Sequence, residues 1–182
     1  MKKRRNGFQI SNSLPDEVRE SLYCDGGVAG ANPSTIGGCW AWVLVSVGGK
    51  KLRSASGFVS PDCFGVPKIT NNVTELLAAV QALEAVPSYW DGILYTDSMI
   101  TLYRLTSASP SFNGVPKKLI NRVMILRDGR NWKVKHVAGH PTLREIQDGV
   151  NSRGQPVSKW NRACDLQCCR IARKHGGQIC QT

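Results

Sequence analysis

The apolar residues between positions 76 and 83 recur with the period of an α-helix. They fall at i, i+3, i+4 and i+7, the spacing of one buried helix stripe, and are Leu76, Ala79, Val80 and Leu83. The polar turn Thr70–Asn72 precedes this stripe, and Pro87 follows it. We therefore expect an amphipathic helix that begins at this turn and stops at Pro87.

Segments typical of β-strands lie on both sides of this helix. Three precede it, at residues 21–24, 38–45 and 51–59. Two follow it, at 92–96 and 131–137, and further helices are expected at 98–105, 117–126 and 161–174. A short apolar strand after a helix suits parallel pairing in a βαβ crossover. The order predicts an α/β fold with a mixed five-stranded sheet flanked by helices, in which three antiparallel strands are followed by parallel additions.

The length of 182 residues fits a single domain with short extensions. We assign residues 1–20 to a basic N-terminal extension, 21–175 to the domain and 176–182 to a C-terminal tail. We interpret Lys2–Arg5 first as a solvated tail, next as an arm that contacts phosphate and last as a nuclear-import patch. We expect 139–159 to be a long polar loop, and such loops are usually functional or mobile.

The charge is strongly basic, with 24 Lys and Arg against 13 Asp and Glu and a net charge of +11. This excess favours a polyanionic partner, usually nucleic acid. We expect no membrane association, because the chain has no apolar run of ~20 residues and no signal peptide. The seven cysteines are interpreted as reduced thiols of a cytoplasmic protein. Cys164, Cys168 and Cys169 could suggest a metal cluster, but we favour packing of one helix face on the core.

Four acidic residues occupy distinctive positions in this basic chain. Asp25 and Asp97 end two of the apolar strand segments. Glu75 directly precedes the apolar stripe of the central helix, and Asp165 lies near the start of the last helix. Glu75 alone could simply favour a helix N-terminus. Taken together, the four carboxylates are expected to converge on divalent metal, because such groups repel one another strongly unless cations neutralise them.

The ligand type indicates which metal and which reaction to expect. Oxygen-only ligands suit Mg²⁺ or Mn²⁺, which also bind the phosphate oxygens of a substrate. Two such ions ~4 Å apart can activate a water and stabilise the leaving oxygen of a phosphodiester. A basic chain that attracts nucleic acid and an acidic cluster that holds metal together predict a metal-assisted nuclease.

Four segments, in this order and spacing, resemble type 1 ribonuclease H. They are Tyr23–Gly27 with Asn32-Pro33, Thr70–Leu76, Tyr95–Ser98, and Ala138–Pro141 with Asn161–Asp165. Each motif is weak alone, but all four in order are specific, and together they cover about residues 20–175. The resemblance implies a ribonuclease H fold with the four acids as ligands of two metal ions. It further implies hydrolysis of the RNA strand of an RNA–DNA hybrid, leaving 3′-hydroxyl and 5′-phosphate ends.

The resemblance also implies substrate contacts near the central helix. The family's hybrid-binding positions fall on Asn32, Asn71 and Asn72, and its DNA-phosphate pocket falls on Thr70. Short amides and a hydroxyl can hydrogen-bond to 2′-hydroxyls, base edges and phosphates. The alternative is turn chemistry, because Asn and Thr also favour turns and helix caps. We favour substrate contact because these residues stand in register with Glu75.

One departure from the family pattern concerns the basic handle, a helix and loop found in well-studied bacterial enzymes. Residues 107–130 are too few for the full handle. A basic face could still be supplied by Lys117, Lys118, Arg122, Arg127 and Arg130. Trp132 could stack on the sugar-phosphate backbone or belong to the core.

A second departure is the length of the 139–159 loop, which leaves the catalytic histidine open. The family's mobile histidine position falls on Val137, which cannot transfer a proton. His136 should face the opposite side of an alternating strand. We therefore favour His140 as an auxiliary that shuttles a proton or aids product release. The alternative is that His140 only anchors the loop.

Two other functions could use the same fold. A non-catalytic nucleic-acid-binding module is disfavoured, because unneutralised acids weaken binding to a polyanion. A junction resolvase or integrase-type nuclease is disfavoured by the Thr-Asn-Asn before Glu75, which belongs to hybrid recognition. A purely structural protein is the least favoured alternative. We expect a monomer, and the compact chain with its long loop is compatible with a phage origin.

Overall fold

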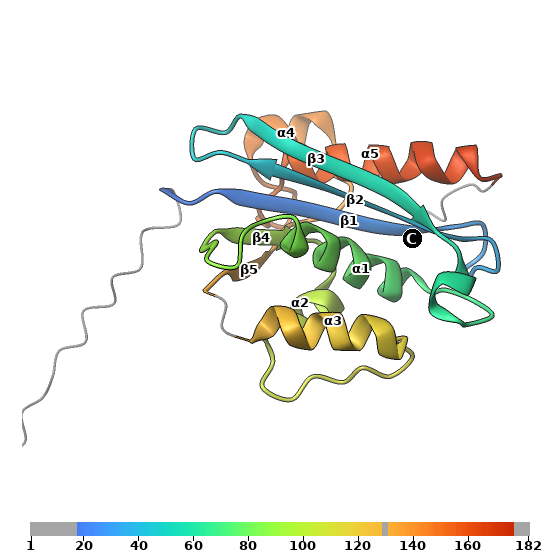
Figure 1. The fold of residues 1–182 in the computed structure, drawn as a ribbon. Helices are drawn as coiled ribbons and strands as arrows, with labels where there is room; N and C mark the ends of the chain where they lie inside the picture. Colours follow the sequence, from blue (N-terminus) through green and yellow to red (C-terminus); the bar gives the residue numbers. More distant parts are fainter. Residues whose placement is uncertain (1–17, 129–130, 177–182) are drawn as a thin grey trace, which may run out of the picture.

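The structure is a computed structural model that describes residues 18–128 and 131–176 (Figure 1). Its strands form one sheet in the order β3-β2-β1-β4-β5. Their bounds are β1 Ser21–Ala29, β2 Gly37–Val45, β3 Lys51–Val59, β4 Ile93–Thr96 and β5 Lys133–His136. Strands β1, β2 and β3 pair antiparallel, whereas β4 pairs parallel to β1 and β5 parallel to β4. The predicted mixed five-stranded sheet is confirmed.

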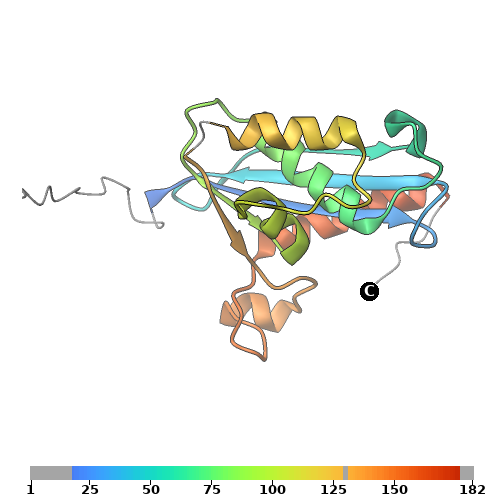
Figure 2. The ribbon, with the colours of Figure 1, turned by 90° about the horizontal axis from the view of Figure 1, so that it is seen from below.

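Helices cover both faces of this sheet (Figures 1 and 2). One face carries α1 (Asn71–Glu84), with α2 (Met99–Thr106) and α3 (Lys117–Arg127) beside it. The other face carries α5 (Lys159–Lys174). A short 3-10 helix, η2 (Pro61–Phe64), follows β3, and α4 (Leu143–Asp148) lies between β5 and α5. None of the helices in the described ranges is long and apolar enough to span a membrane.

The core has two parts because β1 and β2 bury side chains on both faces. Leu22 and Cys24 contribute to the part that packs against α1 and α3. Cys39 and Val43 contribute to the part that packs against α5. Cys164 and Cys168 of α5 are buried in this second part, as expected for a helix face packed on the core. Cys169 departs from that prediction, because it is only partly buried and its Sγ lies 3.8 Å from Asp165 Oδ1. The central strands therefore have little freedom to move, and this rigidity fixes any residue placed on them.

Helix α1 is buried more completely than its apolar stripe predicts. The four stripe residues are fully buried, and so are Leu77, Ala78 and Ala82 on neighbouring faces. The additional burial arises because α1 lies on the sheet while α2 and α3 pack against it (Figure 1). Glu75 lies in the second turn, not in the first turn as expected, because the helix already begins at Asn71.

Strand β1 extends further than predicted. We expected it to end at Asp25, but it continues through Gly26 and Gly27 to Ala29. Gly26 allows the close approach of α1 at this point and does not form a turn. A Cβ atom on Gly26 would lie 2.3 Å from the backbone carbon of Thr74 in α1. Asp25 therefore lies in the middle of a rigid strand and not at its end.

The segment 139–159 was expected to be a loop, and that prediction was wrong in part. It contains α4, whose start has a capping box formed by Thr142 and Glu145. Val150 and Pro156 form an antiparallel bridge after α4. Figure 2 shows this small insert projecting from the body of the sheet between β5 and α5. The insert therefore has local secondary structure, which the polar composition of residues 139–159 did not predict.

Two predictions concern residues at the limits of the structure. Lys2–Arg5 and Arg130 lie outside the described residues. Of the expected N-terminal extension the structure describes only Val18, Arg19 and Glu20, and of the expected tail only Gly176.

Trp132 precedes β5 rather than forming part of it. Its ring packs against the core cluster under α1, which favours the core alternative over stacking on substrate.

Candidate active site

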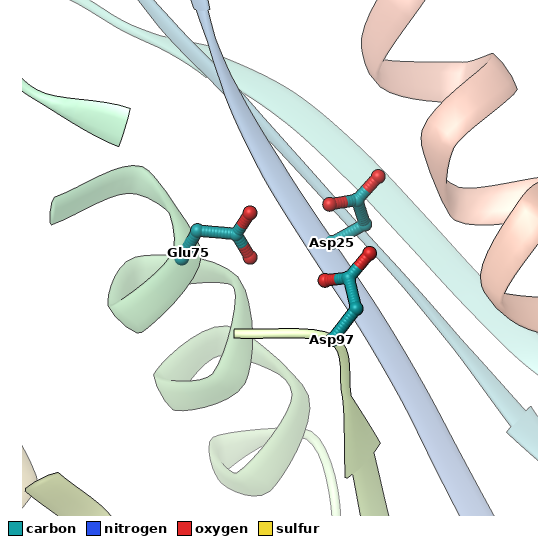
Figure 3. A group of neighbouring side chains, drawn as sticks. All are labelled: Asp25, Glu75 and Asp97. Carbon is teal, nitrogen blue, oxygen red and sulfur yellow. The ribbon is translucent and has the colours of Figure 1, made fainter. Parts of the chain in front are cut away.

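The site begins where two parallel strands lie side by side. β1 and β4 pair with Tyr23 opposite Tyr95. Asp25 follows two residues after Tyr23, and Asp97 two residues after Tyr95. Because side chains alternate along a strand, residues at matching offsets from a paired position project to the same face. Figure 3 shows the two carboxylates side by side at this point of the sheet.

Helix α1 brings the third carboxylate, Glu75, over the sheet (Figure 3). The approach is possible because Gly26 and Gly38 have no side chains beneath the helix. A Cβ on Gly26 would lie 2.4 Å from the backbone nitrogen of Glu75, and one on Gly38 would lie 2.2 Å from Cγ2 of Thr74. Glycine is required at both positions by this close approach.

Asp25, Glu75 and Asp97 each place one carboxylate oxygen within 4.8 Å of the others. Asp25 and Glu75 are buried, with 5% and 7% of their surfaces exposed. Glu75 Oε2 and Asp97 Oδ1 are buried oxygens with no hydrogen-bond partner among the described residues. Buried acceptors are almost always satisfied in native proteins. An oxygen-rich site with unsatisfied carboxylates fits a hard divalent cation, so these three residues could hold one.

The cost of bringing these acids together is visible in their pKa values. Burial raises the pKa of Asp25 well above its usual range, and the nearby charges of Asp97 and Asp165 raise it further. Burial, then Asp25 and Asp97, raise the pKa of Glu75 in the same way. Burial also raises the pKa of Asp97, although a hydrogen bond from Asn161 lowers it in part. A bound cation would remove this penalty by stabilising the charged forms.

The fourth acid, Asp165, lies at the edge of this triad. It projects from α5 into the same cleft, and 19% of its side chain is exposed. His140 Nδ1 lies 3.5 Å from Asp165 Oδ2. The Asp165 carboxylate is the main cause that raises the pKa of His140 to about 9. The structure thus brings together all four predicted acids and the favoured histidine.

His140 has an unusual backbone for a residue other than glycine, with φ at 48°. Half of its side chain, 52%, is exposed to the cleft. His136 faces elsewhere, and its Nε2 donates a hydrogen bond to the backbone carbonyl of Asp97 over 3.2 Å. A carbonyl can only accept, so this contact fixes the strand rather than presenting an imidazole to substrate.

Two residues that support Asp97 were missed by reasoning from the sequence. Asn161, fully buried at the start of α5, donates from Nδ2 to Asp97 Oδ2 over 3.1 Å. Gly139 leaves room for the same carboxylate, since a Cβ there would lie 2.6 Å from Asp97 Oδ2. Asn161 is the first residue of the Asn161–Asp165 motif, so the sequence did indicate that this position matters. Its contact with Asp97 could not be predicted, because the two residues are 64 positions apart in the chain.

The predicted substrate residues form a rim beside Glu75. Asn71 and Asn72 line the cleft at the first turn of α1. Asn32 accepts a hydrogen bond at Oδ1 from the Asn71 backbone N–H over 3.1 Å, which links the loop after β1 to α1. Asn71 Nδ2 also lies 3.5 Å from Glu75 Oε1. Thr70 is the N-cap residue, but its side chain makes no capping hydrogen bond and is therefore not engaged in that role.

The cleft itself has a volume of about 410 Å³. Its walls come from β1, α1, the start of α2, the segment at Gly139 and α5. Lys117 and Lys118 are exposed on α3 but do not line this cleft. A model of the RNase H family matches residues 17–166, a range that contains all four acids.

The chain belongs to the RNase H family. A curated ribonuclease H from Chlorobium phaeovibrioides (strain DSM 265 / 1930) is 37% identical over 82 residues, which are 45% of this chain and 48% of that protein. This RNase H chain therefore spans about half the length of the curated relatives it matches.

Solved structures share the fold of this chain. RNase H1 from the halophilic archaeon Halobacterium salinarum NRC-1 superposes with a TM-score of 0.61 at 23% identity, covering 86% of this chain and 98% of that one. LC11-RNase H1 in complex with an RNA/DNA hybrid gives a TM-score of 0.57 at 18% identity, with coverage of 86% and 98%. At such identities the likeness shows a common fold.

Proposed function

We propose that this RNase H family member is an endonuclease that hydrolyses the RNA strand of RNA–DNA hybrids. Asp25, Glu75, Asp97 and Asp165 would hold two Mg²⁺ or Mn²⁺ ions when substrate is bound. The products would carry 3′-hydroxyl and 5′-phosphate ends. The observation that carries this proposal is the triad of carboxylates within 4.8 Å of one another, which lines a cleft and includes two oxygens with no hydrogen-bond partner among the described residues.

The acidic cluster argues for catalysis rather than for binding alone. A site that only binds nucleic acid gains nothing from three clustered carboxylates, which repel phosphate and one another. When bound, divalent ions would supply an activated water and stabilise the oxygen that leaves phosphorus. The chain's contribution is to hold the four carboxylates on rigid elements, which spares the site reorganisation during the reaction.

Recognition of the hybrid would begin at the rim beside Glu75. The amides of Asn71 and Asn72 lie at the cleft and can hydrogen-bond to 2′-hydroxyls and base edges in a minor groove. Asn32, tied to the Asn71 backbone, would contact the same strand. The hydroxyl of Thr70, which makes no cap hydrogen bond, would meet a DNA phosphate at the N-terminus of α1. A fold neighbour, LC11-RNase H1, has been solved with such a hybrid.

More distant contacts would come from the basic face of α3. Lys117 and Lys118 are exposed and lie outside the cleft, where they would meet the backbone of a duplex longer than the reactive segment. Trp132 is not included among the proposed contacts, because its ring packs against the core.

His140 would act as an auxiliary. It lines the cleft, lies 3.5 Å from Asp165 and keeps half of its side chain exposed, so it can reach both a metal ligand and solvent. A histidine so placed would assist proton transfer or product release, while the carboxylate-bound ions supply most of the rate. Its unusual φ of 48° supports a functional role, because non-glycine residues adopt such values when the surroundings impose them.

A substrate panel tests the proposed function. Labelled RNA–DNA hybrid, double-stranded RNA, double-stranded DNA and single-stranded RNA would each be incubated with Mg²⁺, Mn²⁺ or a chelator. We expect cleavage of the hybrid alone, and only with metal. Equal cleavage of duplex DNA would favour a resolvase-type nuclease, and tight hybrid binding without cleavage would favour a binding module.

A further inference from the structure

Arg104 is a buried cation whose role the active site does not explain. It lies in the last turn of α2, and only 6% of its surface is exposed. Burial lowers its pKa. Within the described residues no carboxylate forms an ion pair with it. A buried charge is costly unless hydrogen bonds compensate for lost solvation, so its partners must account for its position.

Those partners are three backbone carbonyls from two separate segments. Nη1 donates to the carbonyl of Asn72 over 3.2 Å, in the first turn of α1. Nε donates to the carbonyl of Ser111 over 3.3 Å, and Nη2 donates to that of Asn113 over 3.4 Å. The planar guanidinium is suited to this because its donors diverge in a fixed fork. Arg104 therefore joins the substrate-facing turn of α1 to the loop between α2 and α3.

The loop, residues 107–116, is held at further points by its flanking helices. Arg127 of α3 donates to the carbonyls of Arg104 and Ser107. The Tyr103 hydroxyl donates to the carbonyl of Ser109 over 3.0 Å. Val115 is buried in the core at the end of the loop. This segment is thus an ordered bracket between α2 and α3, and Arg104 adds a hydrogen bond that joins it to the first turn of α1.

We propose that Arg104 is a positioning residue for substrate recognition. By fixing the carbonyl of Asn72 against the loop, it orients the first turn of α1, so that the amides of Asn71 and Asn72 and the loop present one preformed edge to the nucleic acid. The inference rests on the proposed function and adds to it a residue outside the four acids. The acids lie on β1, after β4, in the second turn of α1 and on α5, and none of them contacts the guanidinium.

Preorganisation of this kind affects binding more than chemistry. Without the guanidinium, the Asn72 turn and the loop lose the residue that connects them. The free energy needed to order them then reduces the free energy of substrate binding. The metal-binding carboxylates keep their places. The expected signature is therefore a raised KM for hybrid with a kcat that changes little.

The test compares Arg104→Met and Arg104→Lys with a matched control, Arg53→Met. Arg53 lies on β3 and donates to the backbone carbonyl of Ala85 at the C-terminal end of α1, away from the loop and the cleft. Steady-state cleavage of a hybrid would be measured well below the melting temperature of each variant. We expect Arg104→Met to raise KM about tenfold, the effect of losing a charged hydrogen bond, with kcat within about twofold. Arg104→Lys should fall between, since an ammonium keeps the charge but not the fork.

A double-mutant cycle with Asn72→Ala shows whether Arg104 acts through the Asn72 turn. If it does, most of the KM effect of Arg104→Met should disappear in the Asn72→Ala background. A KM equal to that of Arg53→Met, or full additivity with Asn72→Ala, would overturn this inference while hybrid cleavage by the wild type stands. A wild-type protein that fails to cleave hybrid would instead overturn the proposed function. Hybrid binding, measured by anisotropy in the Asp97→Asn background, would then still test Arg104.

Discussion

Asn161 at the start of α5 donates a hydrogen bond to the carboxylate of Asp97 after β4, with 3.1 Å between Nδ2 and Oδ2. The contact joins α5, which lies on the face of the sheet opposite α1, to the segment that follows β4 (Figure 1). It also lowers the pKa of Asp97, against the larger effect of burial. Asn161 therefore favours the ionised form of Asp97, which its proposed role as a metal ligand requires.

Asn161→Ala should weaken metal use more than folding. Removal of a residue that orients a ligand typically costs about 10- to 100-fold in metal affinity or activity. We expect the Mg²⁺ concentration for half-maximal cleavage to rise within that range. Gln167→Ala, an exposed position on the same helix, is the control and should leave the metal titration unchanged. An unaltered titration for Asn161→Ala would show that the hydrogen bond is only structural.

Gly26→Ala should damage both stability and activity. The added Cβ would lie 2.3 Å from the Thr74 backbone, so α1 must shift and carry Glu75 away from Asp25. Overpacking of this kind costs about 1–3 kcal/mol in the free energy of unfolding. Gly48→Ala is the matched control, since its Cβ would have no atom closer than 3.9 Å, and we expect a change within about 0.5 kcal/mol. Denaturant unfolding of both variants measures the difference, and equal stabilities would refute the close-packing account.

The raised pKa values predict how the metal-free protein responds to pH. Asp25, Glu75 and Asp97 bind protons more tightly folded than unfolded. Their contribution to stability is complete below the unfolded pKa of about 4 and is lost as pH rises through the folded values. In chelator, Asp97→Asn should therefore melt higher than the wild type at neutral pH, with the gap closing toward pH 4. A sharp fall in the melting temperature of Asp97→Asn would instead make Asp97 a structural residue.

The sequence was most informative where a residue type serves a single physical purpose. The apolar stripe around Leu76 predicted the position of α1, and each of the four acids was assigned to the strand or helix that carries it or directly precedes it. It was less informative at Gly26, because glycine is typical of both turns and close packing, and only the position of Thr74 distinguishes the two. Strand β1 was therefore predicted too short.

Other features were hidden by distance or by polarity. Thr142 and Glu145 have the spacing of a capping box, a signal that could have revealed α4 within the supposed loop. Arg104 gave no signal, because the carbonyls it contacts are backbone groups whose positions only the fold determines. The polar contacts of the site are long-range, whereas sequence patterns report local periodicity.

His140→Ala should lower turnover by about ten- to a hundred-fold while hybrid binding persists. The reason is its place beside Asp165 in the cleft, with half of its side chain exposed. His136→Ala is the comparison, since His136 contacts the carbonyl of Asp97 and should affect stability more than turnover. Single-turnover cleavage and thermal melting of both variants separate these effects. A fully active His140→Ala with an impaired kcat for His136→Ala would reverse the assignment.

The most direct measurement uses a DNA strand that contains a short block of ribonucleotides, labelled at one end and paired with complementary DNA. If the four carboxylates act as proposed, cleavage should be confined to the ribonucleotide block, should require Mg²⁺ or Mn²⁺, should leave 3′-hydroxyl and 5′-phosphate ends, and should be lost in Asp97→Asn. Cleavage outside the block, or cleavage that persists in chelator or in Asp97→Asn, would contradict the account.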